Sequence, residues 1–234
     1  MAAVLAGIVM TAAGTAAHAQ STSPSAPAGE PVILRVGVTA NLDTDNVFAV
    51  SAGSDYTVAT SEYDMLLKFS STDLTAAPSL ATGCDHNTDY TVWTCHLRDG
   101  LKWSDGQPLT SEDVAFTYRF VIDNNIPQYK SYFPSDPTFE TPDPTTLVWK
   151  AKEPTFAPSM PPWVYIVPEH VWAPYDGKDL KTIRDVSQTP AVGSGPFILT
   201  SWTPGQGFTM DRNPYYWGPT PTLSRIEYKV YTNQ

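Results

Sequence analysis

Two cysteines and two histidines lie close together in this chain, and they are compatible with two kinds of chemistry. Cys84 and Cys95 flank a short segment, and His86 and His96 lie beside them. In an oxidising compartment, two cysteines at this spacing predict a disulfide across a hairpin or its flank. A zinc site is the alternative, but the order C-x-H…C-H matches no standard finger, and adjacent Cys95 and His96 would point to opposite faces of a strand. We therefore expect a Cys84–Cys95 disulfide and no metal.

The segment Gly193-Ser194-Gly195 has two residue types that often serve in phosphate binding or nucleophilic catalysis. It is not a phosphate loop, because no Lys-Ser/Thr pair follows it, and it is not a nucleophile elbow, because Ser194 lacks the G-x-S-x-G frame. Its glycines instead predict a place where two backbones cross closely. No Ser/His/Asp or Cys/His arrangement has a motif frame elsewhere. The sequence therefore indicates no catalytic site and no cofactor.

Aromatic residues make up 12% of the 234-residue chain, with 7 Trp and 12 Tyr. Such rings can fill a β-rich core, and some of them can line a ligand site by stacking on sugars or peptide side chains. The formal net charge of −10 argues against a nucleic-acid partner and against an anionic membrane surface. A hydrophobic content of 41% indicates a globular protein.

The stretch from Trp93 to Asn125 predicts a compact local unit. Alternation over Trp93–Leu97 predicts a half-buried strand, and Leu101–Trp103 follows as a second short strand after an Asp-Gly turn. Thr110 is a good N-cap for a helix. That helix carries an apolar stripe from Val114 to Ile122 and stops near Asn124-Asn125.

Further elements are expected on both sides of this unit. Val32–Thr39 reads as a buried strand, and Ser61–Phe69 as a short helix or strand. Prolines make Ile126–Asp143 a loop without regular helix, and Asp176–Thr189 is expected to be a surface connection. The remaining expected strands are Pro144–Lys150, Phe197–Trp202, the run from Phe208 to Pro214, and the alternating run Ile226-Tyr228-Val230.

Three stretches in order carry a resemblance to a known family. "LRDGLKWSDGQPLTSEDVAFTY" (Leu97–Tyr118), "YIVPEHVW" (Tyr165–Trp172) and "VGSGPFILTSWTPGQGFTMDRNPYYWG" (Val192–Gly218) resemble the extracellular solute-binding proteins of family 5, the peptide and nickel type. These proteins are the substrate-binding subunits of ABC importers. The resemblance runs from about Leu34 to Gln234, and it implies a binding protein and no enzyme.

The resemblance implies a mixed α/β fold of the type II periplasmic-binding-protein kind. It divides the chain into a first segment of lobe I (31–55), an inserted smaller β-rich lobe (56–189) and a second segment of lobe I (190–234). Segments 31–55 and 190–234 should then share one sheet. Family members continue into a further large lobe that closes on the ligand, so this chain is expected to be the N-terminal part of a longer protein.

Candidate ligand contacts come partly from the resemblance and partly from residue type. In the family, the residues after the first strand face the ligand, which makes Thr39, Ala40 and Asn41 candidates; a loop of local turns is the alternative reading. Tyr129 and Tyr132 lie in the proline-rich stretch that could border the ligand cleft. Trp163 could reach a ligand or fill the core.

The N-terminus reads as an export signal. Residues 2–17 are small and almost wholly apolar, and Ala17-His18-Ala19 fits a cleavage site, so we expect a signal peptide over 1–19 and a disordered linker over 20–30. No cysteine precedes Cys84, so a lipid anchor at the cleavage site has no acceptor. We expect a periplasmic or extracellular monomer that takes peptides or similar small solutes and delivers them to an ABC permease. A secreted carbohydrate-binding or hydrolase-accessory module is the alternative.

Overall fold

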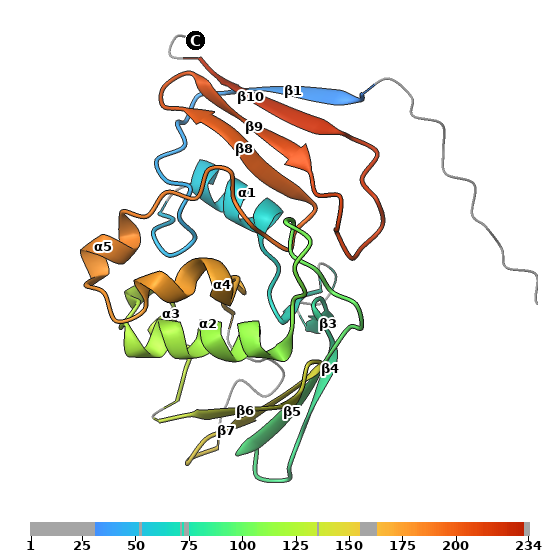
Figure 1. Ribbon diagram of the computed structural model, residues 1–234, viewed down its shortest axis with the longest axis vertical. Coiled ribbons are helices and arrows are strands. Elements are labelled where there is room, and N and C mark those ends of the chain that lie inside the picture. Colours follow the sequence, from blue (N-terminus) through green and yellow to red (C-terminus); the bar gives the residue numbers. More distant parts are fainter. Residues whose placement is uncertain are drawn as a thin grey trace, which may run out of the picture. The chain divides into compact units, whose positions relative to one another are not determined.

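The computed structural model describes residues 31–51, 53–70, 72, 75–134, 136–154 and 163–231. The expected signal peptide (1–19) and linker (20–30) lie outside the described residues. The described chain contains two four-stranded sheets, one two-stranded sheet and several helices, which is the mixed α/β class that the sequence predicts (Figure 1).

The first sheet joins strands from opposite ends of the described chain. Its order is β1 (Ile33–Val38), β10 (Arg225–Val230), β9 (Gly207–Arg212) and β8 (Phe197–Thr203). Strand β1 runs parallel to β10, and the other neighbours are antiparallel. This is the sheet sharing between the 31–55 and 190–234 segments that the family resemblance implies. The division of the chain into lobes at 55/56 and 189/190 remains a proposal.

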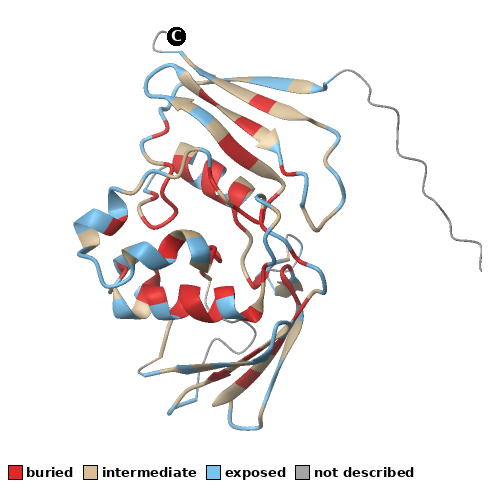
Figure 2. Cartoon of the chain, in the orientation of Figure 1, coloured by how far each residue is buried: buried red, intermediate tan, exposed pale blue. Residues whose placement is uncertain are grey.

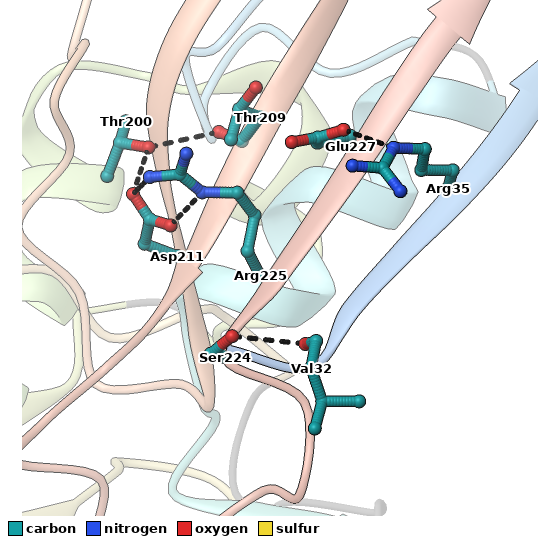
Figure 3. A network of polar contacts seen from close by, with 8 residues as sticks. All are labelled: Val32, Arg35, Thr200, Thr209, Asp211, Ser224, Arg225 and Glu227. Atoms are coloured by element: carbon teal, nitrogen blue, oxygen red, sulfur yellow. Dashed lines mark hydrogen bonds and ion pairs between the residues drawn. The ribbon is translucent and has the colours of Figure 1, made fainter. Parts of the chain in front are cut away.

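One face of this sheet is held by charged and polar side chains (Figure 3). Arg225 on β10 donates through two nitrogens to Asp211 on β9, at 2.6 and 2.9 Å, and Thr200 Oγ1 on β8 donates to the same carboxylate at 2.8 Å. Arg35 on β1 donates to Glu227 on β10 at 2.9 Å. These pairs join all four strands and favour one register, because a slip of one residue would turn each partner to the other face.

The other face of the sheet packs on helix α1 (Gly53–Glu62). Val58 of α1 contacts an apolar cluster with Leu199, Phe208 and Met210 of the sheet. The 61–69 segment, which the sequence left open between helix and strand, is both: it holds the end of α1 and then strand β2 (Leu67–Phe69), which pairs with β3 (Ala76–Pro78). The boundary proposed at 55/56 falls inside α1.

The second four-stranded sheet carries the main core together with helix α2. Its order is β4 (Ala81–His86), β5 (Val92–Leu97), β7 (Thr146–Lys150) and β6 (Thr138–Asp143). Helix α2 (Ser111–Asp123) packs against β6 and β7, and most of its ribbon is coloured as buried in Figure 2, with exposed residues between the buried ones. The Thr110 hydroxyl accepts from Glu112 N at 3.3 Å, and Asp113 Oδ2 accepts from Thr110 N at 2.9 Å. The predicted helix and its cap are therefore present.

The disulfide predicted from the cysteine spacing is formed. Cys84 on β4 and Cys95 on β5 are paired across the two antiparallel strands, with an S–S distance of 2.02 Å. Cys95 is buried in the core cluster. The zinc alternative is therefore wrong, and no group of three or more His, Cys, Asp or Glu in the described part of the chain could hold a metal ion.

Four local expectations need correction. The strand predicted as buried over Val32–Thr39 is β1, which lies at an edge of its sheet with Leu34 exposed. Leu101–Trp103 forms no strand, because only a single bridge joins Lys102 to Pro108. The proline-rich stretch Ile126–Asp143 is not all loop. It contains a short helix, α3 (Pro127–Lys130), since a proline at the first helical position lacks only an amide that would be unpaired there, and it ends in strand β6 (Thr138–Asp143). The surface connection contains helix α5 (Leu180–Arg184), which follows α4 (Glu169–Trp172) and a 3-10 turn over Ala173–Tyr175. Asp179 caps α5 by accepting from Thr182 N at 2.9 Å.

The glycine segment crosses the end of α1 at close range, as its residue types predict. A Cβ on Gly195 would lie 2.2 Å from Ser61 O, and a Cβ on Gly193 would lie 2.2 Å from Glu62 O. The backbone N–H of Gly195 donates to Glu62 O at 2.7 Å. This crossing ties the incoming strand β8 to the α1 helix that packs on it.

A candidate ligand-binding surface

Four aromatic rings from separate parts of the chain are at least partly exposed, and three of them, Phe69, Trp163 and Tyr132, are neighbours. We call Tyr56, Phe69, Tyr132 and Trp163 the aromatic surface. Tyr132, Tyr56 and Phe69 are 48%, 44% and 39% exposed, and Trp163 is half-buried. The Trp163 ring stands edge-on to Phe69, with centroids 3.6 Å apart, and lies 6.3 Å from Tyr132. Exposed aromatic side chains in such a group are typical of sites that bind amphipathic ligands.

Two buried tyrosines support this surface from below. Tyr129 is 5% exposed, and its ring lies 6.5 Å from Tyr132 and edge-on to Phe48. Its hydroxyl donates to Val47 O at 3.1 Å. Tyr165 forms a single β-bridge with Met65, just before β2. Both tyrosines are therefore held by backbone on the inner side of the surface.

The pKa values of these two phenols are raised, mainly by burial and to a smaller extent by Tyr56. Burial, with a smaller contribution from the phenol of Tyr56, raises the pKa of Tyr165 to about 12. Burial also raises the pKa of Tyr129 above its ordinary value, with smaller contributions from Tyr165, Tyr56 and Tyr132. Because these hydroxyls stay protonated at neutral pH, Tyr129 and Tyr165 give the surface no charge. It therefore suits an apolar or aromatic ligand group better than an ionic one.

The residues that follow β1 lie beside the first turn of α1. Thr39, Ala40 and Asn41 are all exposed. Ala40 O accepts from the Ser54 hydroxyl at 3.4 Å, and Ser54 precedes Tyr56 by two residues on α1. The first turn of α1 thus joins the 39–41 loop to the aromatic surface. A ligand that covers both would meet exposed backbone at one end and rings at the other.

The structure brings some of the predicted contacts together and changes the part that one of them plays. Tyr132 and Trp163 are neighbours on the exposed surface, whereas Tyr129 is enclosed beneath them with its hydroxyl already bonded. We therefore assign Tyr129 a supporting position. The direct contacts proposed for Thr39, Ala40, Asn41, Tyr132 and Trp163 remain proposals.

Sequence reasoning missed Tyr56 and Phe69. Helix α1 has no strong apolar stripe that would separate its core face from its exposed face, so the exposure of Tyr56 had no signal in the pattern. Phe69 ends a three-residue strand, where alternation is too short to assign a face. The aromatic residue type of Tyr56 and Phe69 was the only signal in the sequence that could have marked them as ligand contacts.

The buried polar groups near the crossing serve packing. Ser194 is fully buried, and its Oγ accepts from Asp64 N at 2.9 Å. Glu62 is also fully buried, and its Oε1 accepts from Leu199 N at 2.7 Å. Burial raises the pKa of Glu62 to about 8, partly offset by the bond from Leu199. Ser194 and Glu62 Oε1 thus hold backbone amides inside the fold, while Glu62 Oε2 is buried without a hydrogen-bond partner among the described residues.

Comparison with known proteins places the chain in a family. The family model described as bacterial extracellular solute-binding proteins, family 5 Middle, matches residues 75–234. The probable peptide-binding protein YejA of Agrobacterium fabrum is 31% identical over 207 residues, which cover 86% of this chain and 33% of that protein. The chain spans about a third of the length of the curated relatives it matches.

Solved structures agree on the fold. The ABC transporter substrate-binding protein CtaP of Listeria monocytogenes superposes with a TM-score of 0.73 at 24% identity, covering 86% of this chain and 41% of that one. MoaA from A. tumefaciens R10, solved with mannopinic acid, gives a TM-score of 0.73 at 25% identity and covers 87% and 41%. Across the described residues, no helix has the length and apolar character needed to cross a membrane.

Proposed function

Because the chain belongs to the bacterial extracellular solute-binding proteins of family 5, we propose that it is part of the substrate-binding component of an ABC importer. In this proposal the protein acts outside the cytoplasm as a monomer, carries a cleaved signal peptide, and delivers its solute to a membrane permease without catalysing a reaction. The family match and the relatives named for peptide and substrate binding support this function.

The proposed ligand is a peptide or a similar small solute held at the aromatic surface and the 39–41 loop. The observation that carries this choice is the grouping of Tyr56, Phe69, Tyr132 and Trp163 above the neutral phenols of Tyr129 and Tyr165. Rings bind many side chains without demanding one sequence, and exposed peptide groups at Thr39–Asn41 could pair with an extended ligand backbone. A further lobe, as in the family, would cover the opposite side of the ligand.

The test is peptide binding to this chain and to the full-length protein that contains it. Chemical-shift titration with a dipeptide-to-pentapeptide pool detects the weak binding expected of one wall alone, with a cello-oligosaccharide pool in parallel. Tyr132→Ala and Trp163→Ala should each weaken peptide binding about tenfold or more, the effect of losing about 1.4 kcal/mol. Tyr231→Ala removes an equally exposed tyrosine beyond β10 and should change nothing. Equal losses in all three variants, or binding of the sugars alone, would refute the proposal.

A further inference from the structure

A cavity lies beside the 43–49 loop, whose Val47 contacts Tyr129 under the aromatic surface. It has a volume of about 700 Å³, is open to solvent, and is lined by the 43–49 loop, helix α5 with the residues after it, and Trp202 of β8. Small-molecule sites usually have about 300–1,000 Å³. Val47 of the same loop accepts the Tyr129 hydroxyl, while Asp45 and Ala49 line the cavity. The loop therefore separates the cavity from the aromatic surface.

Buried polar side chains fix the walls of this cavity. Asp45 Oδ2 accepts from Ser187 Oγ at 2.7 Å, Gln188 N at 2.9 Å and Thr189 Oγ1 at 2.5 Å. Fully buried Asn46 donates to the carbonyls of Ile183, at 2.7 Å, and Val186, at 3.0 Å, which ties the end of α5 to the loop. A site whose walls are already held in place loses less conformational entropy when a ligand binds.

Some charged side chains that line the cavity have hydrogen-bond or ion-pair partners, and others have none among the described residues. Lys181 pairs with Asp185, and Asp45 has its three donors. The side chains of Arg184 and Asp43 make no hydrogen bond or ion pair with any residue that the structure describes, and both are exposed. Trp202 is half-buried and packs partly against the apolar cluster under β8. The free groups are thus one cation, one anion and one ring.

We propose that this cavity is a second binding site, for a free α-amino acid with an apolar side chain. Arg184 pairs with the ligand carboxylate, for which a guanidinium fork is well suited. Asp43 accepts from the ammonium group, and the Trp202 ring packs against the apolar side chain. The near balance of charge in the lining, three acidic and two basic residues, disfavours phosphates and other polyanions. This inference stands apart from the proposed function, because no residue of the aromatic surface lines the cavity.

The experiment follows the indole N–H resonance of Trp202 in the full chain during titration with a panel of free L-amino acids. The resonance is assigned by its loss in Trp202→Phe. L-leucine, L-isoleucine and L-methionine should shift it, whereas L-leucinamide, which lacks the carboxylate, and N-acetyl-L-leucine, which lacks the ammonium group, should bind at least tenfold more weakly.

Two variants and two controls complete the test. Arg184→Gln should weaken L-leucine binding at least tenfold but should not further weaken the binding of L-leucinamide, which lacks the carboxylate. Asp43→Asn should also weaken L-leucine binding at least tenfold but should not further weaken the binding of N-acetyl-L-leucine, which lacks the ammonium group. Lys178→Gln changes an exposed cation outside the lining, and Tyr132→Ala changes the aromatic surface; neither should alter the titration. The proposal is overturned if no amino acid shifts the Trp202 resonance, if the two blocked analogues bind as well as leucine, or if Arg184→Gln binds leucine like the unmodified chain.

Discussion

The indole N–H of Trp217 donates to Asp64 Oδ2 at 2.7 Å, across 153 positions of sequence. Asp64 follows directly on the end of α1, and Trp217 follows the Asn213-Pro214 turn after β9. The Arg98 guanidinium lies over the Trp217 ring, 4.5 Å from its centroid. Asn213 Nδ2 also donates to Gly195 O at 2.9 Å. These contacts fasten the sheet that contains β8–β10 to the segment that leads into the second sheet.

Trp217→Phe should therefore destabilise the protein. The substitution leaves the mostly buried Asp64 carboxylate without its indole donor, and such a loss costs about 1–3 kcal/mol. Urea unfolding should show a lower midpoint with an unchanged slope. Tyr215→Phe, which removes one hydroxyl in the same turn from an exposed residue, should leave the free energy of unfolding within about 0.5 kcal/mol of the original. Equal midpoints for Trp217→Phe and Tyr215→Phe would contradict the assigned role.

Glu62 should make stability depend on pH. Burial raises its pKa in the folded state to about 8 from 4.5, and the nearby Asp45 carboxylate adds to the rise. The folded state therefore holds the proton more tightly than the unfolded state. The stabilisation that comes from protonated Glu62 is complete below pH 4.5 and is lost as pH rises from 4.5 to 8.

Glu62→Gln is the matched variant, because its amide oxygen can still accept from Leu199 N while the charge is removed. The free energy of unfolding of the unmodified protein should fall by a few kcal/mol between pH 5 and 8, at about 1.4 kcal/mol per pH unit for one proton. The slope for Glu62→Gln should be clearly flatter. The slope is compared, and not the absolute free energy of unfolding, because the buried amide NH2 group of the new glutamine can itself lower stability at every pH. Parallel curves for the two proteins would show that Glu62 does not titrate in this window.

Local sequence rules predicted those elements that carry several independent signals, such as a capping residue and an apolar stripe. The helix over Ser111–Asp123 has both an N-cap and a stripe, and the cysteine pair predicted the disulfide that joins β4 to β5. Short helices such as α3 and α5 gave no such signal, because four or five residues cannot establish a helical period. That β1 shares a sheet with strands of the 190–234 segment came from the family resemblance, since no local rule joins strands so far apart; the parallel pairing of β1 with β10 was not predicted.

The candidate site was predictable only in part, for a related reason. Residue type marks Tyr132 and Trp163 as rings, but exposure depends on what the rest of the chain covers. The same lack of information placed Tyr129 among the ligand contacts, although Val47 and Phe48 enclose it. The cavity near Arg184 depends on the buried side chains of Asp45 and Asn46, whose many hydrogen bonds cannot be read from a polar loop sequence.

Removal of the disulfide should lower stability without unfolding the protein under mild conditions. Cys84 and Cys95 are 11 positions apart, and closing a loop of this size contributes about 3 kcal/mol in the chain-entropy model. The double variant Cys84→Ala/Cys95→Ala should show a lower urea midpoint, and a reducing agent should lower the midpoint of the unmodified protein but not that of the variant. A midpoint insensitive to both treatments would mean that the hairpin is held by its strand pairing alone.

Gly195→Ala tests the close crossing over α1. The added Cβ would lie 2.2 Å from Ser61 O and 2.8 Å from Glu62 C, and both are backbone atoms that cannot rotate away. The segment must then move, which should break the Gly195 N–H bond to Glu62 O and strain the bond between Leu199 N and Glu62. We expect a loss of about 2–4 kcal/mol, or failure to fold. Gly83→Ala is the control, because a Cβ on this β4 residue meets no atom within 4 Å, and alanine there should be neutral or slightly stabilising. If the two alanine variants unfold at the same urea concentration, the crossing has room that the structure does not show.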